Sequence, residues 1–136
     1  MSKEFKKDFF IYIFILSLLV VTYHLILGLF FHHKLNRISN LFLVPVALYS
    51  VFYVKRRRKK LIKTPYGFFI YHLATYIIVN SSFWIHAFYL KFVDPTFIFD
   101  MYWKGALYGM SLVWGIFLLI HAIASWVNRG FAEVEL

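Results

Sequence analysis

The chain has 136 residues, of which 62% are hydrophobic and only 15% are charged. Soluble domains carry about 25% charged residues, so these side chains are too few to cover a globule in water. We therefore predict a single integral membrane domain over residues 1–136. Cysteine is absent, which excludes disulfides and thiolate metal sites.

The first predicted element is a membrane-spanning helix over residues 9–31. These 23 positions contain no Asp, Glu, Lys or Arg. A spanning helix needs about 20 residues, whereas the apolar region of a cleaved signal peptide covers about 7–15. We expect this helix to be retained in the membrane.

The second and third elements are predicted at residues 38–54 and 66–90. The second has 17 positions and contains Pro45, which a membrane helix tolerates when neighbours satisfy the freed carbonyl. We predict a thin span there, with a re-entrant or interfacial segment as the alternative. Thr64 and Pro65 precede the third element and are predicted as its N-cap and first helical residue.

The fourth element is predicted over residues 105–127, ending before Asn128-Arg129-Gly130. Gly105 and Gly109 form a GxxxG pair, which lets another helix approach closely, within the chain or between chains. Asn80, in the middle of the third element, can bond across to a neighbouring helix or back to a carbonyl of its own helix. The predicted fold class is an all-α membrane protein with four helices in an antiparallel bundle.

The basic residues predict the orientation of this bundle. Eleven of the 15 Lys and Arg residues fall in the N-terminal tail, the 55–63 loop and the C-terminal tail, which places both termini in the cytoplasm. A basic cluster beside a membrane attracts anionic lipid head groups at about 1 kcal/mol per residue. The placement of this charge between predicted spans argues against nucleic acid as a partner. The residues of this predicted lipid contact are Lys55, Arg56, Arg57, Arg58, Lys59 and Lys60.

Four histidines lie inside the predicted spans and fall into two layers. His72 and His86 are fourteen residues apart in the third element, which places them about 40° apart around the helix and about 21 Å apart along it. By depth, His72 shares a cytoplasmic layer with His121 of the fourth element, and His86 shares an outer layer with His24 of the first. Ionisable groups in spans usually face the bundle interior and pair.

Three interpretations of these histidines stay open. We favour hydrogen-bonded contacts between helices, at about 0.5–2 kcal/mol each, with no cofactor. The alternative is b-type haem with His72, His121, His24 and His86 as axial ligands, because the spacing resembles the cytochrome b helix that carries two ligating histidines. A transition-metal site formed by the adjacent histidines His32 and His33 is disfavoured, because neighbouring side chains on a helix point apart.

Residues 60–127 resemble the bacterial 2TM domain family. The segments "FFIYHLATYIIVNSSFW" and "WGIFLLIHA" carry the resemblance, which implies a pair of helices and coupling between the histidine of each. It also implies a location in a bacterial inner membrane. The matching positions are His72, Tyr76, Asn80, Trp103, Trp114, Gly115 and His121.

No carboxylate lies inside any predicted span, so the converging groups that acid–base catalysis needs are missing. We predict a small non-catalytic membrane protein that acts by association, as an accessory, sensing or effector module. It is expected to form a homo-oligomer or to be a subunit of a membrane complex. The alternatives are a haem electron-transfer protein and an oligomeric pore-forming effector.

Overall fold

The computed structural model describes residues 2–132, and all regular structure in that part of the chain is helical. Four helical stretches are long and apolar enough to cross a membrane: Lys3–Phe31, Arg37–Ile62, Gly67–Val93 and Met101–Asn128. The prediction of an all-α protein with four helices long and apolar enough to span a membrane is therefore confirmed. In chain order the elements are α1 (Lys3–Phe31), α2 (Arg37–Leu41), α3 (Val44–Ile62), α4 (Gly67–Val93), α5 (Met101–Lys104), the π-helix η1 (Gly105–Gly109) and α6 (Met110–Ala132).

Helix α1 begins six residues before the predicted position and ends where we predicted. Ser2 caps it by accepting a hydrogen bond from the Phe5 amide at 3.1 Å. Its buried side chains recur at spacings of three, four or seven residues, which gives the helix one face toward the rest of the bundle. These residues are Phe5, Tyr12, Leu16, Val20, Tyr23 and Leu27.

The second span differs from the single helix predicted over residues 38–54. Asn36 and Ser39 form a capping box that starts α2, and the chain turns before α3. Pro45 lies in the first turn of α3, where its missing N–H has no intrahelical partner to lose. Helix α3 then continues to Ile62, so the basic residues Lys55–Lys60 lie on its last turns and not in a loop.

The predicted N-cap of the third span is also wrong. Thr64 and Pro65 lie in the turn that follows α3, and the Thr64 hydroxyl donates to the Lys60 carbonyl at 3.1 Å. Helix α4 begins at Gly67, after Tyr66 with a left-handed φ of 57°. The turn is so tight that a Cβ on Gly67 would lie only 2.8 Å from the carbonyl oxygen of Leu61.

The fourth span is longer than predicted at both ends. Helical structure starts at Met101 and runs through η1 into α6 without interruption. It continues to Ala132, so the predicted stop before Asn128-Arg129-Gly130 is wrong. The side chains of residues 129–132 lie outside the described part of the structure.

The loop between α4 and α5 is held by two aspartates. The Asp94 carboxylate accepts hydrogen bonds from the hydroxyl and the amide of Thr96, which keep its pKa below the usual value. Asp100 caps α5 by accepting from the Trp103 amide at 2.9 Å. Trp103 is thereby fixed, and its indole N–H donates to the carbonyl of His33 at 2.9 Å.

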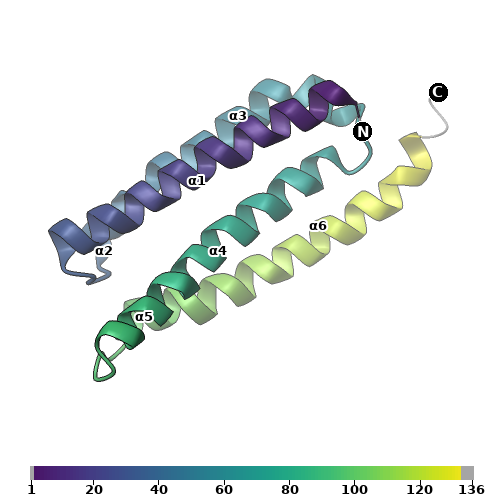
Figure 1. Ribbon diagram of the computed structural model, residues 1–136. Coiled ribbons are helices and arrows are strands. Elements are labelled where there is room, and N and C mark those ends of the chain that lie inside the picture. Colours follow the sequence, from purple (N-terminus) through teal and green to yellow (C-terminus); the bar gives the residue numbers. More distant parts are fainter. Residues whose placement is uncertain (1, 133–136) are drawn as a thin grey trace.

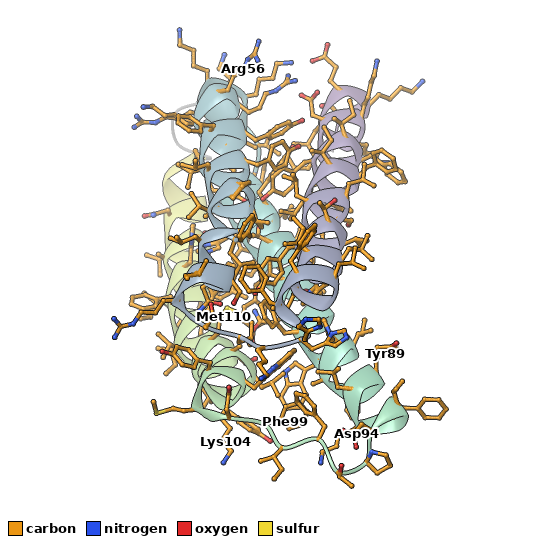
Figure 2. All side chains as sticks on the ribbon, turned by 90° about the vertical axis from the view of Figure 1, so that its left-hand side faces the viewer. Arg56, Tyr89, Asp94, Phe99, Lys104 and Met110 are labelled. Carbon is orange, nitrogen blue, oxygen red and sulfur yellow. The ribbon has the colours of Figure 1, made fainter. Side chains whose placement is uncertain are left out.

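The helices do not close into a symmetric bundle. Helices α1, α3 and α4 all contact one another, whereas α6 packs mainly against α4. Figure 1 shows α1 and α3 together on one side of α4 and α6 on the other. The end with Arg56 and the start of α1 is called the basic end below; Asp94, Phe99 and Lys104 lie at the opposite end (Figure 2).

Ion pairs join α1 to α3 at the basic end. Arg57 contacts the Asp8 carboxylate at 2.8 Å, and Lys60 contacts Glu4 at 3.2 Å. The Tyr53 hydroxyl donates to the Asp8 backbone carbonyl at 2.8 Å. Two of the six basic residues predicted to contact lipid are therefore turned toward α1.

Candidate functional site

The first cluster is a chain of three histidines and a serine near the end opposite the basic end. His24 of α1 and His86 of α4 face each other, with 2.8 Å between their Nδ1 atoms. The other nitrogen of His86 lies 2.8 Å from Nδ1 of His33, and the other nitrogen of His24 lies 2.9 Å from the Ser82 hydroxyl. We call this cluster of His24, His33, His86 and Ser82 the three-histidine chain.

One arrangement of protons satisfies every bond in this chain. The Ser82 hydroxyl donates to the Val79 carbonyl at 2.6 Å, so it must accept from Nε2–H of His24. His24 Nδ1 then accepts from Nδ1–H of His86, and His86 Nε2 accepts from Nδ1–H of His33. All three imidazoles are neutral in this arrangement, so the cluster carries no charge that would need a counter-ion.

The sequence did not indicate that His33 would join His24 and His86. The chain leaves α1 through two left-handed residues, His32 with φ 48° and His33 with φ 62°, which turn the second of them back toward α4. Gly28 makes room for it, because a Cβ there would lie 2.9 Å from the His33 ring. Left-handed backbone is uncommon outside glycine, and the local sequence carries no clear signal for it.

The three-histidine chain does not converge on a point. His86 lies in the middle and directs a different ring nitrogen at each neighbour, so three nitrogens do not meet where one ion would bind. Within residues 2–132, no group of three or more His, Asp or Glu side chains has an arrangement that could hold a metal ion. His32 is exposed and takes no part in the cluster.

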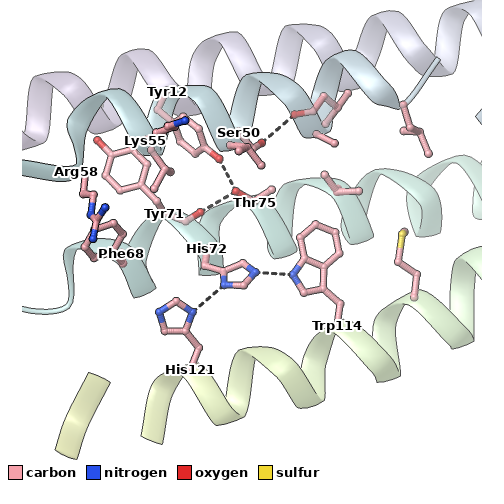
Figure 3. A pocket seen from close by; sticks show the side chains of 17 residues that line it. Tyr12, Ser50, Lys55, Arg58, Phe68, Tyr71, His72, Thr75, Trp114 and His121 are labelled. Carbon is pink, nitrogen blue, oxygen red and sulfur yellow. Dashed lines mark hydrogen bonds between the residues drawn. The ribbon is translucent and has the colours of Figure 1, made fainter. Parts of the chain in front are cut away.

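The second cluster is a histidine pair nearer the basic end. Nδ1 of His72 in α4 lies 3.0 Å from Nδ1 of His121 in α6 (Figure 3). The Trp114 indole N–H donates to Nε2 of His72 at 3.0 Å, so His72 must donate through Nδ1 to His121. Nε2–H of His121 is left without a hydrogen-bond partner in the described part of the chain.

Between the two clusters, Asn80 links α4 to α6. Its amide nitrogen donates to the Tyr76 carbonyl at 2.9 Å, and its amide oxygen accepts from the Ser111 hydroxyl at 2.9 Å. The Tyr76 hydroxyl donates to the Ser111 carbonyl at 3.1 Å, and the Trp84 indole donates to the Ser111 hydroxyl at 3.4 Å. Polar groups therefore connect these two helices along most of their shared length.

The GxxxG glycines are placed differently from the polar groups. A Cβ on Gly105 or Gly109 would meet nothing within 4 Å, whereas one on Gly115 would lie 3.2 Å from the Tyr76 hydroxyl. Gly115 is thus the glycine at which α6 closely approaches α4. Gly105 and Gly109 make no such approach within the described chain, and a contact between chains stays a prediction.

The histidine geometry can be compared with what haem requires. Axial ligation places a metal ion between two ring nitrogens at about 2 Å from each, which separates them by about 4 Å. The facing nitrogens here are 2.8 Å and 3.0 Å apart and share a hydrogen bond. In this arrangement the members of each pair bond to each other, and haem ligation by these four histidines stays a hypothesis.

Comparison with protein-family models finds no match for the chain, and comparisons with curated proteins and with solved structures find none either. The resemblance to the 2TM domain family thus rests on the residue pattern alone. The structure brings two of the matching positions, His72 and His121, into contact. Membership of that family stays a hypothesis.

Proposed function

We propose that this chain is a small non-catalytic integral membrane protein that acts by association, as an accessory, sensing or effector module. It associates with copies of itself, or with another membrane protein, through the face of α6 that points away from α4. The observation that carries this proposal is the position of Gly105 and Gly109, where no other helix of the described residues comes within 4 Å of a Cβ.

The glycines begin an exposed stripe that runs the length of the span. Leu107, between them, is buried, while both glycines are exposed. The stripe continues at alternating spacings of three and four residues, the repeat that keeps one helix face against a partner helix. Its further members, all exposed, are Leu112, Ile116, Leu119, Ile123 and Trp126.

Burial supports the same conclusion. Only 6% of the most apolar stretch of the fourth span is buried, against 33% for the third. Small residues let helix backbones approach closely in a membrane, where dispersion contacts drive association. The π-helix η1 places both glycines in a widened turn, a distortion that frequently occurs at functional sites.

The antiparallel arrangement and the orientation are part of the proposal. The charge distribution favours both termini and Lys55–Lys60 in the cytoplasm of a bacterial cell, with the chain in the inner membrane. Cysteine labelling tests this: Arg56→Cys should be protected from impermeant reagents added outside, and Phe99→Cys should react. The reverse pattern would contradict the orientation.

A pore is less well supported than a packed assembly. The stripe on α6 is wholly apolar, so it supplies no lining for a water-filled channel. The histidine and asparagine side chains that a pore could use are already bonded inside the chain. The proposed assembly is therefore a helix–helix contact without a channel along this face.

Substitution of the glycines tests the association. Gly109→Leu adds bulk where the chain itself is open, so the monomer should fold normally while close approach of a second helix is blocked. We expect dimerisation to weaken on the order of tenfold or more, measured by Förster transfer between labelled copies in lipid vesicles at several protein-to-lipid ratios.

The matched control is Ala124→Leu, which adds bulk to an exposed position of α6 that is not three or four residues from any member of the stripe. It should associate like the original chain. A chain that stays monomeric at every ratio, or a Gly109→Leu variant that associates normally, would overturn the proposal.

A further inference from the structure

An apolar groove lies between α3 and α6, with α4 as its floor. It has a volume of about 620 Å³ (Figure 3), within the range of about 300–1,000 Å³ typical of small-molecule sites. The groove exists because α6 packs mainly against α4 and leaves the side toward α3 uncovered. It lies on a different face of α6 from the glycine stripe.

The polar side chains in this groove are mostly satisfied inside the protein. The Ser50 hydroxyl donates to the Val46 carbonyl at 3.0 Å, and the Thr75 hydroxyl donates to the Tyr71 carbonyl at 2.8 Å. His72 uses both ring nitrogens. The remaining lining is dominated by valine and other apolar side chains, so the groove is suited to a hydrocarbon chain.

Unneutralised positive charge is confined to the basic end of the groove. Lys55 and Arg58 line it there (Figure 3), and neither forms an ion pair with any described residue. Arg57 and Lys60, which face α1, are paired with carboxylates. No acidic residue is among those that line the groove. The complement of this end is an anion.

The length of the groove matches a membrane lipid. It extends along α3 from Leu43 to Arg58, which corresponds to about 22 Å of helix. One leaflet of the hydrocarbon core is about 15 Å thick. The groove is therefore long enough for an acyl chain, with the head group at the level of the two free cations.

We propose that this groove is a binding site for one molecule of anionic phospholipid. The phosphate lies against Lys55 and Arg58, and an acyl chain follows the floor formed by α4. His121, which lines the groove and has a free Nε2–H, offers a donor for an ester carbonyl of the lipid. This site goes beyond the proposed association and does not depend on it.

Native mass spectrometry of the full chain in detergent micelles tests the site. Phosphatidylglycerol and phosphatidylcholine with identical acyl chains are titrated separately. We expect one phosphatidylglycerol to bind in preference to phosphatidylcholine. The double variant Lys55→Gln/Arg58→Gln should lose on the order of 100-fold in affinity, because it removes two charge-assisted contacts to the phosphate.

A matched variant removes the same charge from the same turns of α3. Arg56→Gln/Lys59→Gln alters residues that do not line the groove, and its affinity for phosphatidylglycerol should stay nearly unchanged. An equal loss in both double variants would show only diffuse attraction of lipid to the basic end and would overturn the site.

The apolar part of the groove is tested by Ala47→Phe, which fills it without changing charge. We expect loss of the bound phosphatidylglycerol, with circular dichroism and size exclusion confirming that the variant folds. Lipid binding that persists in a folded Ala47→Phe variant, or equal binding of phosphatidylcholine, would overturn the proposal. So would an Ala47→Cys variant that cross-links to a second copy, because the groove would then hold a helix.

Discussion

Replacing His86 with phenylalanine removes the middle of the three-histidine chain while keeping a ring of similar shape. His24 loses the donor to its Nδ1, and His33 loses the acceptor for its Nδ1–H. Hydrogen bonds between membrane helices contribute about 0.6 kcal/mol on average and up to about 1.7. We therefore expect His86→Phe to lower the free energy of unfolding by about 1–3 kcal/mol.

A double-mutant cycle separates this effect from lost packing. His24 and His86 share a bond, so their interaction energy should fall between about 0.6 and 1.7 kcal/mol. His24 and His33 touch only through His86, and their coupling should be below about 0.5 kcal/mol. A larger coupling between these two ends would show that the bonds polarise one another along the chain.

The measurement is unfolding in mixed micelles with increasing dodecyl sulfate, followed by circular dichroism. Tryptophan fluorescence reports the cluster itself, because the Trp103 ring lies 5.4 Å from the His86 ring. Phe88→Leu is the control, since Phe88 is 69% exposed on the same helix. If His86→Phe were no more destabilising than Phe88→Leu, the hydrogen-bonded chain would be refuted.

Three further substitutions probe the packing around the site. The Tyr23 hydroxyl is buried and has no hydrogen-bond partner among the residues that the structure describes, so Tyr23→Phe should stabilise the fold by about 1 kcal/mol in the same micelle assay. The Tyr12 hydroxyl donates to Thr75, so Tyr12→Phe should destabilise it by about 0.6–1.7 kcal/mol; the opposite order would contradict the bonding described here. Gly67→Ala should cost about 1–3 kcal/mol through its clash with a backbone carbonyl, whereas an equal loss in Gly105→Ala, where the chain is open, would refute that explanation.

The histidine contacts show what sequence spacing could predict. Counting residues to the end of each apolar run gives the depth of a side chain, because a membrane helix rises about 1.5 Å per residue. Depth placed His72 with His121 and His24 with His86, and the structure brings each pair within hydrogen-bond distance. Any function of either pair beyond joining the helices stays a prediction.

His33 shows where this reasoning ends. Its position depends on left-handed backbone at the end of α1 and on a hydrogen bond from Trp103, 70 residues away. Neither can be read from the local sequence. The start of α2 is a different case, because the Asn36 and Ser39 capping box that begins this helix is visible in the sequence.

The charges at the end of α3 could not be assigned from composition either. Six consecutive basic residues look equivalent in the sequence, but helical structure distributes them over different faces. Arg57 and Lys60 are three residues apart and meet α1, and Lys55 and Arg58, also three apart, line the groove. Residues three apart lie on the same side of a helix, so four of the six basic residues divide into one pair that bonds to α1 and one pair that faces the groove.

Both the proposed association and the proposed lipid site involve helix α6. This helix packs mainly against one neighbour, α4. Lipid tails are as apolar as leucine, so burial alone does not drive one membrane helix against another; hydrogen bonds at Asn80 and His72 hold α6 to α4. Its groove side and its glycine stripe thus stay open to different ligands. Because the two faces share no residue, Gly109→Leu should leave lipid binding intact, and Lys55→Gln/Arg58→Gln should leave association intact.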